Sequence, residues 1–122
     1  GVLDMLRFHL AGQGQGWEGD YGSIRDPEEF RALYAYSPLH HLKPGTAYPP
    51  VLVVTGDHDT RVAPWHSFKF LAALQAAQGG SAPVLLKLES TAGHGGGTRL
   101  KAQLADAADI YAFVLKSLGV ER

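Results

Sequence analysis

The sequence predicts an α/β fold in which parallel strands lie between layers of helices. Two short apolar segments, from Pro50 to Thr55 and from Val84 to Glu89, are bounded by turn-forming residues. Such segments are typical of strands that are buried on both faces of a parallel sheet. Segments with helical periodicity precede, separate and follow the two strands, and this alternation favours a parallel sheet flanked by helices.

The N-terminal third predicts a glycine-rich loop and one clear helix. A short helix is compatible with Asp4 to Leu10, whereas Leu10 to Gly22 is rich in glycine and predicts a loop. The clear helix begins at Asp26, which can cap it, and Pro27 suits the first helical position. Glu29 completes the spacing of a capping box, in which two side chains satisfy free N–H groups at the helix start.

Two longer helices follow in the C-terminal two thirds. The first of them runs from about Pro64 to Gln78 and ends at Gly79 and Gly80, which stop a helix. The second begins near Thr98 and keeps a helical period in its apolar residues over about five turns. We expect this apolar stripe to be core; its members are Leu100, Leu104, Ala107, Ala108, Tyr111, Val114, Leu115 and Leu118.

Two strands are too few for a parallel sheet of this kind. A parallel pair must be covered on both faces, and it still leaves two strand edges without partners. We therefore expect further strands N-terminal to Gly1. The 122 residues are of a normal size for one domain, and we interpret residues 1–122 as a single unit, the C-terminal portion of a larger α/β sheet.

Composition excludes several classes of function. The formal net charge of −1 gives no signal for a nucleic-acid or membrane partner, and no apolar run approaches the roughly 18 residues of a membrane span. The absence of cysteine excludes a disulfide scaffold and a thiolate nucleophile. The spacing of Asp57, His58, Asp59 and His66 matches no zinc pattern, so we predict neither a metal nor a cofactor. No signal peptide is visible, and the compartment, cytoplasmic or periplasmic, is not indicated.

Asp59 and His94 are the candidates for catalysis. Asp59 lies in the polar loop after the first strand, and His94 lies in a glycine-rich loop after the second. Ligands and catalytic groups collect at the carboxyl ends of parallel strands, and adjacent strands are only about 5 Å apart. A carboxylate there would fix the imidazole tautomer and leave the other ring nitrogen free as a base. Asp57 is the alternative acid, and a plain turn-forming role is the alternative for Asp59.

The third member of a serine-hydrolase triad is missing from the chain. In α/β-hydrolases the order along the chain is Ser, Asp, His, and the serine lies in a Gly-x-Ser-x-Gly elbow. None of the six serines has the paired glycines. Either the nucleophile lies before Gly1 or the protein is not a hydrolase.

Several motifs in order resemble the C-terminal part of the catalytic domain of the prolyl oligopeptidase family. They are Trp17–Gly22, Tyr36–His40, Asp57–Val62 and Ala92–Gly96, and the resemblance covers essentially the whole chain. It implies an α/β-hydrolase with a β-propeller lid that cleaves short peptides after proline. The partners implied are a short proline-containing peptide, the rest of the catalytic domain and the propeller.

The resemblance also implies roles for individual residues. Asp59 would be the triad acid, His94 the general base, and Arg61 would hold a substrate carbonyl group. Trp17 would stack on the proline ring, and the pocket would be closed by Val2, Tyr21 and Val62. The serine, the rest of the oxyanion hole and the propeller would lie before Gly1.

Other readings stay open from the sequence. A relative within the same fold could cut after basic residues, release acylamino acids or act as an esterase, although Trp17 with Tyr21 favours proline. A non-catalytic binding module with vestigial triad residues is a different class. Trp17 could instead fill a gap in the core, and Arg61 could pair with a surface carboxylate.

Overall fold

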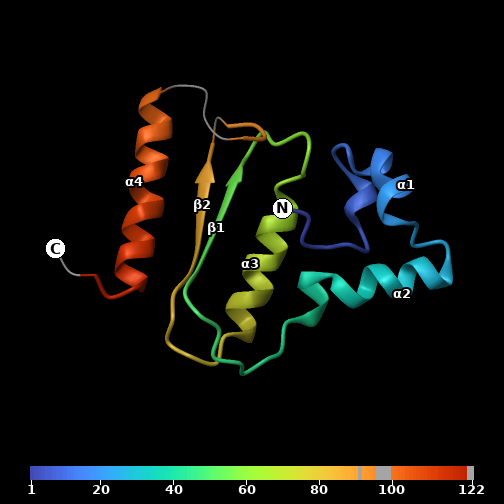
Figure 1. Ribbon diagram of the computed structural model, residues 1–122, viewed down its shortest axis with the longest axis horizontal. Helices are drawn as coiled ribbons and strands as arrows, with labels where there is room; N and C mark the ends of the chain where they lie inside the picture. Colours follow the sequence, from blue (N-terminus) through green and yellow to red (C-terminus); the bar gives the residue numbers. More distant parts are fainter. Residues whose placement is uncertain (91, 96–99, 121–122) are drawn as a thin grey trace.

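The computed structural model describes residues 1–90, 92–95 and 100–120 and confirms an α/β fold (Figure 1). The two strands, β1 (Val51–Gly56) and β2 (Val84–Glu89), pair in parallel with Val51 opposite Val84. The α-helices are α1 (Glu18–Tyr21), α2 (Pro27–Tyr36), α3 (Trp65–Ala77) and α4 (Leu100–Ser117). Short 3₁₀ helices are η1 (Phe8–Leu10), η2 (Gly14–Trp17) and η3 (Pro38–His41).

Helices α3 and α4 lie on opposite sides of the strand pair (Figure 1). A parallel pair needs a crossover connection, and α3 provides it between β1 and β2. The N-terminal segment and α2 lie beyond α3, on the side away from α4 (Figure 1). The carboxyl ends of both strands lie side by side at the same end of the pair. The strands pair in parallel without offset, so the last residue of β1, Gly56, is opposite the last residue of β2, Glu89.

Local signals placed the start of α2 correctly. The Asp26 carboxylate accepts hydrogen bonds from the N–H groups of Glu28 (2.8 Å) and Glu29 (3.0 Å), and Pro27 is the first helical residue. The reciprocal bond of a capping box is absent, because the Glu29 carboxylate accepts instead from the N–H of Ser23 at 2.7 Å. Glu29 therefore ties the preceding turn to the helix rather than closing the box.

Two element predictions in the N-terminal half need correction, and one short helix was not predicted. Residues 4–10 form only the 3₁₀ turn η1, and the predicted loop from Leu10 to Gly22 contains η2 and α1. The backbone of Gly14 packs tightly against Phe8. A Cβ on Gly14 would lie 1.8 Å from the carbonyl oxygen of Phe8, so glycine is required there. Helix η3 was not predicted. The predicted helix start at Thr98 lies outside the described residues.

A buried hydrophobic cluster lies in the N-terminal half, and further buried residues, among them Leu74 and Ala77, lie on α3. Met5, Phe8 and Leu33 form the centre of this cluster, and four partly buried side chains pack against it, namely Val2, Leu6, Trp17 and Ile24. Within its described length, α4 has no buried residue, and Leu100 and Leu118 are 70% and 72% exposed. The prediction that the α4 stripe is core is therefore wrong for this chain, because two strands are too narrow to cover it. The strands are also only partly buried, with Val54 and Leu85 exposed.

We predict that the isolated 122-residue chain associates with itself or behaves as a loosely packed compact state. The exposed apolar stripe of α4 and the two free strand edges present surfaces that pair with other chains. Light scattering with a hydrophobic dye should show association and dye binding while the helical circular dichroism signal persists. Leu104→Gln, in the 63%-exposed centre of the stripe, should reduce dye binding. A monomer with a sharp thermal transition and no dye binding would contradict this prediction.

Candidate active site

The loops after β1 and β2 bring Asp59 and His94 together. Nδ1 of His94 lies 2.9 Å from Oδ2 of Asp59, which confirms the predicted contact. Because the carboxylate can only accept at this distance, Nδ1 carries the proton and Nε2 is the free nitrogen. In the part of the chain that the structure describes, Asp59 is the only side-chain hydrogen-bond partner of His94. The pair therefore presents an oriented imidazole with one unoccupied basic nitrogen.

Asp59 is held in place through its second oxygen. Oδ1 accepts the N–H groups of Arg61 at 2.9 Å and Val62 at 2.8 Å, so the carboxylate forms the turn as well as binding the imidazole. Burial raises the pKa of Asp59, but the hydrogen bonds from Val62, His94 and Arg61 outweigh it and bring the pKa below its ordinary value. The side chain is thus a fixed anion at neutral pH.

Asp57, the alternative acid, does not make this contact. Its backbone N–H donates to the carbonyl of Glu89 at 2.9 Å, and its side chain is exposed to solvent. The N–H of His58 donates to the carbonyl of Ala92 at 3.1 Å. These two backbone bonds fasten the Asp59 loop to the end of β2 and to the loop that bears His94.

Gly56 allows the two loops to approach and was missed at the level of sequence. A Cβ at this position would lie 2.4 Å from the carbonyl oxygen of Ala92 and 2.9 Å from that of Gly93. Atoms cannot come that close, so any larger residue would push the His94 loop away. A glycine at the last residue of a strand is a usable sequence signal, because it often marks a close approach of another backbone.

A cavity of about 180 Å³ opens beside the pair. Its walls include Asp59, His94 and Val62, together with Gly1 from the N-terminal segment and Ser67 from α3. Of the predicted pocket residues, only Val62 lines this cavity alongside the pair. The cavity is where a reacting group could reach the free nitrogen of His94.

The other predicted pocket residues lie on the N-terminal cluster. Trp17 and Tyr21 meet edge to face with ring centroids 6.3 Å apart, and Tyr21 meets Phe8 in the same way at 5.5 Å. Val2 and Trp17 both pack on the core around Phe8. The structure thus brings Trp17, Tyr21 and Val2 together around the Phe8 core, and none of the three lines the cavity beside Asp59 and His94.

Arg61 connects these two groups through its backbone. Its carbonyl accepts the N–H of Gln13 at 3.2 Å, and a Cβ on Gly12 would lie 2.7 Å from the same oxygen. Gly12 has a φ of +63°, which favours glycine. Within the described residues the Arg61 side chain forms no ion pair, so the reading in which it pairs with a surface carboxylate finds no support.

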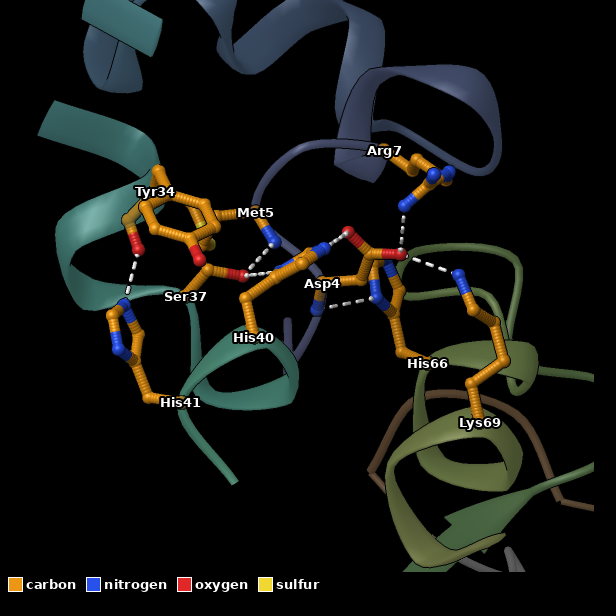
Figure 2. A network of polar contacts seen from close by, with 9 residues as sticks. All are labelled: Asp4, Met5, Arg7, Tyr34, Ser37, His40, His41, His66 and Lys69. Atoms are coloured by element: carbon orange, nitrogen blue, oxygen red, sulfur yellow. Dashed lines mark hydrogen bonds and ion pairs between the residues drawn. The ribbon is translucent and has the colours of Figure 1, made fainter. Parts of the chain in front are cut away.

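A second Ser–His–Asp arrangement exists but is unsuitable for catalysis (Figure 2). Oγ of Ser37 lies 2.7 Å from Nδ1 of His40, whose Nε2 is 3.9 Å from Oδ1 of Asp4. Ser37 is completely buried and its hydroxyl oxygen accepts the N–H of Met5. A substrate cannot reach it, so we assign this arrangement a structural role.

The described residues contain no group of three or more side chains able to hold a metal ion. None of their helices combines the length and apolarity needed to cross a membrane.

An oriented Asp–His pair beyond the carboxyl ends of parallel strands, in the chain order Asp then His, is the arrangement that the acid and base have in the α/β-hydrolase fold. Comparison with known proteins gives the family within that class. The model of the prolyl oligopeptidase family matches residues 1–121, and the chain belongs to this family.

Relatives and solved structures agree with this assignment. The chain is 47% identical to a prolyl endopeptidase of Elizabethkingia meningoseptica and 44% identical to one of Dictyostelium discoideum. Each match covers 99% of the 122-residue chain. A solved prolyl endopeptidase superimposes with a TM-score of 0.94 at 43% identity, covering 98% of this chain and 18% of that one. Oligopeptidase B of Leishmania major matches at 25% identity, with a TM-score of 0.83 over 88% of this chain and 15% of that one.

The chain spans only a small part of these relatives. It covers 17% of the Elizabethkingia enzyme and 16% of the Dictyostelium enzyme.

Proposed function

We propose that this chain is the C-terminal part of the catalytic domain of a serine peptidase that cleaves short peptides on the carboxyl side of proline. In this proposal it supplies the acid, the base and most of the proline pocket. The observation that carries the proposal is the 2.9 Å contact between His94 and an Asp59 that is fixed by two backbone N–H groups. Membership of the prolyl oligopeptidase family supports it.

The geometry suits His94 for both proton transfers. A serine hydroxyl from outside the 122 residues attacks the peptide carbonyl carbon, and Nε2 of His94 takes its proton. Asp59 stabilises the resulting imidazolium through Nδ1. His94 then gives the proton to the departing amine as the C–N bond breaks, and water hydrolyses the acyl-enzyme by the same route in reverse.

For proline recognition, the proposal assigns the flat apolar surface to Trp17 and Tyr21. Aromatic faces favour flat apolar rings, and the ring of Tyr21 packs edge to face against that of Trp17. Val2 and Val62 would close the pocket, and Arg61 would hold the carbonyl of the residue before proline. The exposed strand edges and the α4 stripe are surfaces that the rest of the catalytic domain would cover, with a β-propeller as the further partner.

Substrate selectivity of a full-length enzyme that carries this chain tests the proposal. Peptides of matched length that end in proline, alanine or arginine before a chromogenic amide should be cleaved in the order proline, then alanine, then arginine. A serine-directed phosphonate should abolish turnover. Preference for arginine would favour the oligopeptidase reading, and no turnover at all would favour a binding module.

Trp17→Ala should weaken proline substrates selectively. The loss of the stacking surface should lower kcat/KM for proline by about 1–3 kcal/mol, roughly ten- to a hundredfold, with a smaller loss for alanine. Phe30→Ala removes an aromatic ring of α2 that stacks on Tyr34, so it is a matched control and should leave the proline-to-alanine ratio unchanged. Equal losses for both substrates in Trp17→Ala would assign Trp17 to folding instead.

A further inference from the structure

Asp4 is a buried carboxylate at the junction of three parts of the chain (Figure 2). Its side chain is 1% exposed, and it lies between the N-terminal segment, the corner of α2 with η3, and α3. A buried charge is costly unless it is paired, so its partners show what the charge holds together.

The partners on α3 are Lys69 and His66. Nζ of Lys69 forms an ion pair and hydrogen bond with Oδ2 of Asp4. The backbone N–H of Asp4 donates to Nδ1 of His66 at 3.2 Å. Burial lowers the pKa of His66 to about 4, so its ring is neutral at neutral pH and Nδ1 can accept this hydrogen bond.

The residues on either side of Asp4 bind the corner between α2 and η3. The N–H of Met5 donates to Oγ of Ser37 at 3.0 Å, and the carbonyl of Leu3 accepts the N–H of Leu39 at 2.9 Å. Burial raises the pKa of Asp4, but Lys69 and Arg7 outweigh it and bring the pKa below its ordinary value. Asp4 is therefore an anion when these contacts form.

The same segment and the same helix form the walls of the candidate active site. Gly1, three residues before Asp4, lines the cavity that contains Asp59 and His94, and so does Ser67, the neighbour of His66. Met5, which follows Asp4 in the chain, belongs to the hydrophobic cluster on which Val2 and Trp17 pack. The contacts of Asp4 with α3 thus join the N-terminal segment, which bears Val2 and Trp17, to the helix that lines the cavity beside Asp59 and His94.

We propose that Asp4 is a positioning residue that sets the distance between the substrate-binding surface on the N-terminal segment and the Asp59–His94 pair. The proposal rests on the proposed peptidase function. Asp4 does not touch the reacting atoms, so its loss should impair binding of the residue before the cleaved bond more than it impairs the chemical step.

Asp4→Asn and Lys69→Met in a full-length enzyme that carries this chain test the proposal. Each should raise KM for a proline substrate about tenfold, change kcat less than about threefold and reduce the proline-to-alanine preference. The double variant should be no worse than the poorer single variant, because both break one contact. Arg7→Met is the matched control: Arg7 contacts the same oxygen at 3.3 Å from within the N-terminal segment, so it joins no second element and KM should stay near normal.

Active-site titration with a serine-directed phosphonate separates positioning from folding. If the active fraction of Asp4→Asn falls but the remaining enzyme has the normal KM and the normal proline-to-alanine preference, the inference is overturned. A wild-type enzyme that does not cleave proline substrates would contradict the proposed function instead. The phosphonate affinity of Asp4→Asn, compared with wild type, would then decide the positioning role: weaker binding supports it and equal binding refutes it.

Discussion

Asp59→Asn, in a full-length enzyme that carries this chain, is expected to lower kcat by up to about 10⁴-fold with little change in KM. The amide can donate a hydrogen bond to Nδ1 where the carboxylate accepts one. His94 would then adopt the tautomer that carries its proton on Nε2, and its unprotonated nitrogen, Nδ1, would face away from the nucleophile. The amide also cannot stabilise the imidazolium that forms during the reaction. His94→Ala should be at least as damaging, because it removes the base. Steady-state hydrolysis of a proline amide measures both effects.

Asp57→Asn is the matched control for the acid. Asp57 is two residues away and exposed, and it joins the end of β2 through its backbone N–H, which donates to Glu89. Its kcat should stay within about threefold of wild type. Near-normal rates in Asp59→Asn, together with a large loss in Asp57→Asn, would reverse the assignment of the acid.

Gly56→Ala is expected to lower kcat about 10²-fold although residue 56 touches no substrate. The new methyl group would lie 2.4 Å from the carbonyl oxygen of Ala92, so the loop that carries His94 must move. Displacements of about 1 Å between catalytic groups cost rates of this order. The loss should be seen in kcat per active site, measured after phosphonate titration.

Gly19→Ala provides the control for inserting a methyl group. A Cβ at Gly19 meets nothing within 4 Å, and this residue lies in α1, where alanine is the better helix former. It should have normal kcat. If Gly56→Ala reduces the titratable fraction but not the rate per site, the close approach serves folding rather than the placement of His94.

Local patterns were sufficient for much of the architecture. The bounds of β2, the cap and first residue of α2, and the helix after Pro64 follow from short-range rules, because turn residues and caps act within a few positions. The contact between Asp59 and His94 also follows, since parallel pairing without offset puts both strand ends at one edge. The short helices in residues 8–21 do not follow, because their tight turns depend on the close packing of Gly14 against Phe8.

By itself, the sequence determined the α/β class, the Asp–His pair and the expectation that the strand pair needs further partners. Only the tertiary structure decided which surfaces face one another. It shows that the α4 stripe is exposed in this chain, that Gly56 must lack a side chain, and that Val62 but not Trp17 lines the cavity beside Asp59 and His94. It also shows that Asp4 joins the N-terminal segment to α3, more than sixty residues away in the chain. A periodic pattern marks which side of an element is apolar, whereas burial and long-range pairing depend on which other segments the folded chain places against it.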